Sequence, residues 1–173
     1  MACLIAGVAA NAGADSPPRE APATVTRVRI AESRTRDSVR RALANARAQL
    51  ADPSCRQVLS DFADGSGRPL QGSLDALQQP PEEYLTMLFF YDGSGFRGCG
   101  QGIAATTIPG SRVVMICADQ FGKQRWPDGE VTLIHEMLHT LGLGENPPTS
   151  LEINRRVRMR CFDHVAQRKP STR

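Results

Sequence analysis

The chain has 173 residues, of which 40% are hydrophobic and 23% are charged, and its net charge is +3. This balance excludes a disordered tail and a membrane-embedded protein, and the length favours one domain with its own core. The charge is too small to indicate nucleic-acid binding. We therefore expect a single-domain monomer with no membrane span and no nucleic acid among its partners.

The amino terminus has the pattern of a secretory signal. Residues 3–10 are apolar and lead into Ala10-Asn11-Ala12, which matches an A-x-A cleavage site. No Lys or Arg precedes the apolar stretch, so we expect the natural start to lie upstream. The prediction is a signal peptide at 1–12, a linker rich in Ala, Pro and Ser at 13–24, and a folded domain at 25–173. Such a protein would be exported, to the periplasm or the medium.

Helices dominate the expected amino-terminal half of the domain. Alternating apolar residues predict a strand over 26–30, and helical spacing predicts a helix from Asp37 to Leu50, capped by Asp37 or Ser38. Asp52-Pro53 indicates a further helix, with Asp as N-cap and Pro at its first position. Its inner face would carry Cys55, Val58, Leu59 and Phe62. Residues 63–82 lack periodicity and are predicted to form a long loop with at most a short helix.

Strands are expected in the middle of the chain. The apolar run Tyr84–Tyr91 predicts a buried strand, Gly100–Ile108 a flatter one with small side chains, and Arg112–Ala118 a third. Helices are predicted over 128–143 and from Thr149 to about residue 165. This order of elements indicates one compact α+β domain, in which a small mixed sheet packs on the 128–143 helix and helices lie at both ends.

Four cysteines remain if the signal peptide removes Cys3. An even number in an exported chain favours two disulfides, and every pairing that four cysteines allow stays open. We favour Cys99–Cys117, which would tie neighbouring extended segments, and Cys55–Cys161, which would tie an early helix to the last one. No two cysteines have the spacing of a thiolate zinc site.

The motif His135-Glu136-Met137-Leu138-His139 carries the predicted chemistry. Residues four apart share one face of a helix, so both imidazoles can reach one Zn²⁺ ion. Zinc lowers the pKa of a bound water towards neutrality, and Glu136 beside it would act as the general base. Apolar residues surround the motif, and a buried helix needs a reason to carry three such polar side chains. The sequence therefore predicts a catalytic zinc site.

A resemblance supplies the third ligand. The stretch His135–Glu145 resembles the H-E-x-x-H-x-x-G-x-x-H/D segment of the metzincin clan of zinc metallopeptidases. Gly142 takes the place of the family's Gly, which turns the chain sharply out of the helix. Glu145 takes the third-ligand place, where the family has His or Asp. The resemblance implies a zincin-like fold, a zinc ion on His135, His139 and Glu145, and hydrolysis of peptides.

Other third ligands stay open. In the gluzincins, another H-E-x-x-H group, a Glu on the following helix completes the site, and Glu152 is the matching candidate here. Glu152 also fits a capping box with Thr149. Asp163 and His164 are more distant candidates.

Two further features bear on the resemblance. The small residues Gly102–Thr107 resemble the metzincin edge strand that pairs with an extended substrate, which implies substrate contacts at Ile103, Ala104 and Ala105. An ordinary strand of small residues explains the same pattern. Metzincins also carry a Met in a turn beneath the zinc, whereas Met159 falls inside a predicted helix and is left unassigned.

The expected function is that of a zinc-dependent endopeptidase acting on a peptide or protein substrate. A non-peptide zinc hydrolase is one alternative, because the motif sets the chemistry of the water and not the bond that is cleaved. The other is a secreted, disulfide-stabilised binding or structural module without catalysis.

Overall fold

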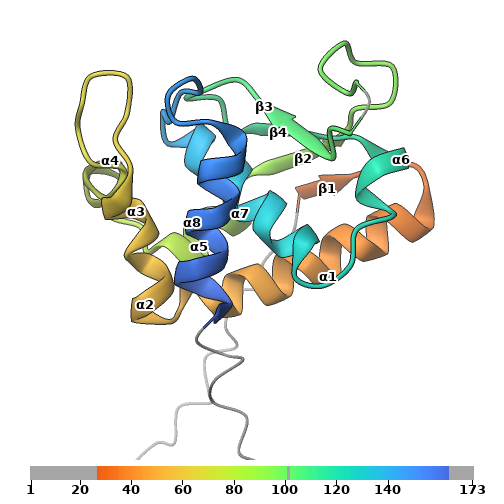
Figure 1. The fold of residues 1–173 in the computed structure, drawn as a ribbon. Coiled ribbons are helices and arrows are strands. Elements are labelled where there is room, and N and C mark those ends of the chain that lie inside the picture. The colour runs from red at the N-terminus through yellow and green to blue at the C-terminus, as the bar shows by residue number, and fades with distance from the viewer. Residues whose placement is uncertain (1–26, 101, 164–173) are drawn as a thin grey trace, which may run out of the picture.

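The structure is a computed structural model that describes residues 27–100 and 102–163. The predicted signal peptide at 1–12 and linker at 13–24 lie outside the described residues, as do Cys3 and His164. The described part folds as a compact α+β unit with a small mixed sheet, which confirms the coarse fold prediction (Figure 1).

The sheet has four strands in the order β1-β2-β4-β3. Its members are β1 (Arg27–Arg29), β2 (Phe89–Asp92), β3 (Ala105–Thr107) and β4 (Val113–Ile116). The first three in this order run parallel, whereas β3 runs antiparallel to β4 and forms an edge. A parallel pair needs a long crossover, and the helices α1 to α5 fill the connection from β1 to β2.

Each strand turns alternate side chains into the core. Val28, Phe90 and Val114 are opposite one another in the register of β1, β2 and β4, and all three are buried. In Figure 1 the sheet lies above α1 and α7. The short helices α2, α3 and α4 lie to the left of α8, on the side away from the sheet.

Helix α1 (Ser33–Leu50) begins earlier than its apolar spacing predicts. The carboxylate of Glu32 accepts hydrogen bonds from the backbone N–H groups of Arg34 and Thr35, so Glu32 is the N-cap. The predicted cap at Asp37 or Ser38 is therefore wrong. The next helix, α2 (Pro53–Arg56), begins where it was predicted, because Asp52 caps it and Pro53 lies in its first turn.

The segment that begins with α2 buries its predicted inner face. A short α3 (Val58–Asp61) follows, and the four predicted inner-face side chains all belong to the core. They are Cys55, Val58, Leu59 and Phe62.

Residues 63–91 differ most from the sequence prediction. Two helices, α4 (Leu70–Leu77) and α5 (Pro81–Thr86), occupy much of the predicted loop, and the predicted strand from Tyr84 begins only at Phe89. Pro81 sets helical backbone angles at the start of α5, and two acidic residues in the first turn favour its N-terminal end. The buried Tyr84 and Leu85 thus face the core from a helix that packs on α1.

The last three helices are α6 (Ala118–Phe121), α7 (Asp128–Thr140) and α8 (Ser150–Cys161). The sequence predicted the two longer ones. The structure ends α7 at Thr140 and not at residue 143, and the predicted end of the last helix near residue 165 lies outside the described residues. From Gly129 to Thr140, α7 is buried at every position except Thr132. No helix in the described ranges is both long enough and apolar enough to cross a membrane.

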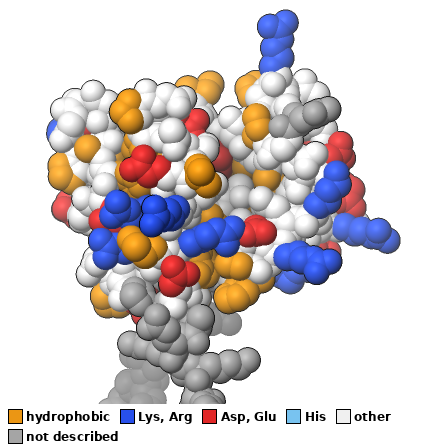
Figure 2. Space-filling view, viewed as in Figure 1, with side chains coloured by type: hydrophobic (Ala, Val, Ile, Leu, Met, Phe, Trp, Pro, Cys, Tyr) orange, Lys and Arg blue, Asp and Glu red, His pale blue; other side chains and the backbone are white. Residues whose placement is uncertain are grey.

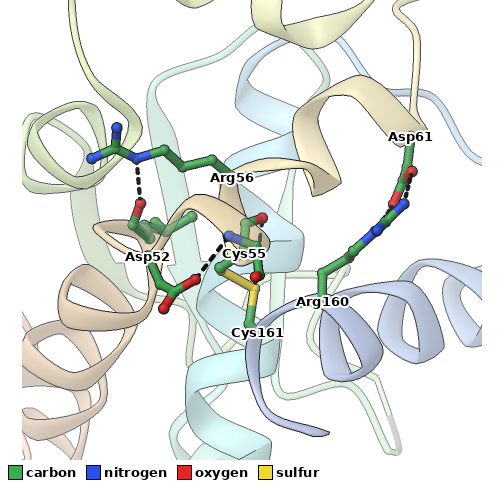
Figure 3. The surroundings of a disulfide bond; sticks show 8 residues. Asp52, Cys55, Arg56, Asp61, Arg160 and Cys161 are labelled. Atoms are coloured by element: carbon green, nitrogen blue, oxygen red, sulfur yellow. Dashed lines mark hydrogen bonds and ion pairs between the residues drawn. A yellow bond between two sulfur atoms is a disulfide. The ribbon is translucent and has the colours of Figure 1, made fainter. Parts of the chain in front are cut away.

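Two disulfides are present, Cys55–Cys161 and Cys99–Cys117, and they have the favoured pairing. The first joins α2 to the end of α8 across 106 positions of sequence. Beside it, Arg160 donates from Nε and Nη2 to the two carboxylate oxygens of Asp61, each over 2.8 Å (Figure 3). A disulfide and a bidentate ion pair therefore fix α8 against α2 and α3.

Candidate metal centre

The H-E-x-x-H residues lie on the buried helix α7. Its neighbours are α1, α8 and the edge strand β3. His135, Glu136 and His139 are 6%, 5% and 5% exposed, so three ionisable side chains are almost removed from water. Such burial is costly unless the polar atoms find partners.

Three ligand atoms converge at this point. Nε2 of His135 lies 2.9 Å from Nε2 of His139, and Oε1 of Glu145 lies 3.5 Å and 3.7 Å from these two nitrogens. A tetrahedral ion with bonds of about 2.0–2.1 Å separates its ligands by about 3.3 Å. The distance between the two imidazole nitrogens is shorter than that value, and the two distances to Glu145 are longer. This trio is the one His, Cys, Asp or Glu group in the described residues that could hold a metal ion.

The end of α7 brings the chain back to His139. Gly142 has φ +104°, and the N–H of Leu143 donates to the carbonyl of Leu138 while that of Gly142 donates to the carbonyl of His139. This is a Schellman ending, for which a glycine in the left-handed region is typical. The turn places the carbonyl oxygen of Leu143 2.7 Å from Nδ1 of His139.

The other imidazole is oriented by α8. Nδ1 of His135 lies 2.8 Å from Oδ1 of Asn154. A carbonyl and an amide oxygen both accept, so each imidazole carries its proton on Nδ1 and turns the lone pair of Nε2 towards the other ring. Burial lowers the pKa of His135, which favours the neutral form that binds metals. Two facing lone pairs repel each other unless a cation lies between them.

Glu145, and not Glu152, joins the two imidazoles. Oε1 of Glu145 also accepts a short hydrogen bond from the hydroxyl of Ser150, the first residue of α8. The backbone N–H of Glu152 donates to the hydroxyl of Thr149, as expected for the first turn of a capped helix. Asp163 is exposed and belongs to no ligand group, and Met159 lies inside α8 as predicted.

Glu136 has an unsatisfied oxygen beside the three ligands. Its Oε2 is buried without a hydrogen-bond partner in the described part of the chain, and so is the hydroxyl of Thr107 on β3. Burial raises the pKa of Glu136 to about 7, against an opposing effect of the nearby Thr107 hydroxyl. Buried polar atoms without partners indicate a place for a further group, such as a water or a ligand.

The edge strand β3 adjoins this helix. Ala105 is buried, Ala104 is half-buried and Ile103 is 41% exposed, so the predicted substrate residues differ widely in accessibility. Thr107 on the same strand is the residue that comes close to Glu136, and sequence reasoning did not single it out. The sequence did offer a signal for Thr107. It lies two positions after Ala105, so the two side chains are on the same face of the strand.

Comparisons of the chain with protein-family models, with curated proteins and with solved structures find no match.

Proposed function

We propose that the protein is an exported zinc-dependent hydrolase with a zincin-like domain, and that its activity is that of an endopeptidase. One observation carries the proposal: Glu136, whose Oε2 is buried without a partner, directly follows His135 on α7 and is influenced electrostatically by Glu145, and these two residues form a possible ligand group with His139. Two neutral imidazoles and a carboxylate are the donor types of a catalytic zinc site.

The roles of the residues follow from their positions. When bound, zinc supplies Lewis acidity and makes water a stronger nucleophile at neutral pH. Glu136 would take the proton of the attacking water and pass it to the leaving amine. The side chain of Glu145 is 38% exposed, so substrate would enter from its side.

Two further features support the finer parts of the proposal. The edge strand β3 has one neighbour in the sheet, β4, so its other edge can pair with an extended peptide. Two disulfides are typical of proteins that fold in oxidising compartments, which agrees with export.

The test is Glu136→Gln compared with the wild type. Purified proteins are loaded with zinc, their metal content is measured by mass spectrometry, and cleavage of an unfolded protein and a mixed peptide pool is followed. Glu136→Gln should keep the zinc and lose cleavage. Glu152→Gln is the matched control, since it also removes a carboxylate and should leave both unchanged.

Each outcome decides between functions. Wild-type cleavage by Glu136→Gln would contradict the mechanism. A wild-type protein that holds zinc and cleaves esters but no peptide would be a non-peptide hydrolase. A protein that holds zinc and cleaves neither would be a structural or binding module.

A further inference from the structure

A cavity lies between α1 and the beginning of α7. Its volume is about 240 Å³, and none of its lining residues belongs to the metal ligands or to Glu136. The residues that matter for its chemistry come from α1, from the segment that joins α6 to α7, and from the first turn of α7. They are Arg41, Asn45, Gln124, Arg125, Trp126 and Glu130.

The first notable group in this cavity is a buried carboxylate. Glu130 is 4% exposed, and its Oε1 accepts a hydrogen bond of 2.8 Å from Nδ2 of Asn45. Its Oε2 has no hydrogen bond and the carboxylate has no ion pair with any residue of 27–100 or 102–163. This oxygen is not among the fully buried atoms that lack a partner, so it is open to solvent. A buried carboxylate with one neutral partner is costly, and a cationic partner would offset that cost.

A second acceptor lies in the same lining. Nε2 of Gln124 donates to the hydroxyl of Thr132 over 2.9 Å, which fixes the amide. Its Oε1 is buried and lacks a partner in the described part of the chain. The cavity therefore holds two oxygen acceptors with unused capacity and calls for a ligand with several N–H donors, as an ammonium group has.

Positive charge and an aromatic ring complete the lining. Arg41 and Arg125 are exposed, and Nη2 of Arg41 is held by the hydroxyl of Ser38 at 3.1 Å. Figure 2 shows Lys and Arg side chains, with Asp and Glu side chains among them, over the side of the molecule where α1 and the segment before α7 lie. Guanidinium groups bind carboxylates. Trp126 is 61% exposed and offers apolar surface.

We propose that this cavity binds a free α-amino acid with an apolar or aromatic side chain. The ammonium group would meet Glu130 and Gln124, the carboxylate would meet Arg41 and Arg125, and the side chain would lie against Trp126. The volume is below the roughly 300–1,000 Å³ of sites for drug-sized ligands, so it suits a molecule of this size. This assignment does not depend on the proposed hydrolase activity.

The experiment uses the fluorescence of Trp126, which is the chain's one tryptophan. The purified full chain is titrated with L-phenylalanine, with phenethylamine and with 3-phenylpropionate, which carry both charges, the cation alone and the anion alone. L-Phenylalanine should bind, and each singly charged compound should bind about tenfold more weakly or worse. Equal affinity for phenethylamine and L-phenylalanine would overturn the zwitterion assignment, and so would no response to L-phenylalanine.

Variants separate the two ends of the ligand. Glu130→Gln should weaken the binding of L-phenylalanine by about tenfold and leave the binding of 3-phenylpropionate unchanged. Arg125→Gln should weaken the binding of both compounds. Arg125 is exposed, so its replacement tests the site even if Glu130→Gln fails to fold, which circular dichroism would reveal. Arg155→Gln on α8 is the control. Unchanged L-phenylalanine affinity in folded Glu130→Gln, or in Arg125→Gln, would contradict the proposal.

Discussion

Nδ1 of His139 lies 2.7 Å from the carbonyl oxygen of Leu143, a residue beyond the end of the helix that carries the imidazole. The contact exists because Gly142 reverses the chain at φ +104°. The way in which α7 ends is thus part of the candidate metal centre, since the same turn orients His139 and leads the chain on to Glu145.

Gly142→Ala should therefore affect both stability and metal binding. A left-handed backbone disfavours a side chain, and a Cβ here would lie 3.2 Å from Cβ of Asp64. We expect a loss of about 1–2 kcal/mol in the free energy of unfolding, together with weaker zinc binding. Urea unfolding and zinc titration measure the two effects. Gly144→Ala is the control, because nothing lies within 4 Å of its added Cβ and its φ is not in that region. Equal losses in the two variants would contradict this account of the turn.

Glu145→Gln and Glu152→Gln should differ sharply in zinc affinity. Glu145 lies within 3.7 Å of both imidazole nitrogens, whereas Glu152 belongs to no ligand group. Loss of a hydrogen-bond partner of a metal ligand lowers metal affinity by roughly 10–100-fold, and Glu145→Gln should lower zinc affinity by more than that. Glu152→Gln should leave zinc affinity unchanged. Competition with a chromogenic chelator gives both constants. A larger loss in Glu152→Gln would assign the third ligand to α8.

Asn154→Ala should lower zinc affinity without unfolding the protein. Its Oδ1 lies 2.8 Å from Nδ1 of His135 and orients that ring, and outer partners of this kind contribute about 10–100-fold in metal affinity. Asn154→Asp should restore binding, because a carboxylate accepts the same hydrogen bond. Arg155→Ala, the neighbouring exposed change on α8, should have no effect. If Asn154→Ala and Asn154→Asp are equally weak, the contact does not orient His135.

The two disulfides should contribute unequally to stability. Cys55–Cys161 spans 106 positions and Cys99–Cys117 spans 18. In the chain-entropy account, loops of about 100 and 15 residues correspond to about 4.7 and 3 kcal/mol. The double variant Cys55→Ser, Cys161→Ser should therefore unfold at a lower urea concentration than Cys99→Ser, Cys117→Ser. The opposite order would show that native contacts outweigh the loop length.

Local patterns predicted the helices around the site because their signals are redundant. Asp52-Pro53 and Thr149 each cap a helix as expected, and apolar residues on every side of the H-E-x-x-H motif indicated that α7 is buried. The prediction of a strand over the whole of residues 84–91 was wrong for a physical reason. A short apolar run suits a strand or a buried helix equally, and Pro81 with Glu82 decided for a helix at its beginning.

The third ligand required geometry that spacing cannot supply. Glu145 and Glu152 are both within reach of His139 along the chain, and the choice depends on how sharply Gly142 turns and on where α8 lies. Asn154 is a distant partner of the motif that only packing reveals, whereas Thr107 could have been found from its place on the same strand face as Ala105. Glu32 as an N-cap was missed because Ser, Thr, Asp and Asn are the preferred capping residues.

The attachment of α8 to α2 has a consequence for the order of assembly. Ser150 and Asn154 orient Glu145 and His135 from a helix whose far end is tied to Cys55, near the other end of the domain. A nascent chain that had emerged only as far as Glu145 would contain every proposed zinc ligand and neither orienting residue. We expect tight zinc binding to begin only after the carboxyl-terminal helix has docked, so that the proposed catalytic power would appear last, in a domain already closed.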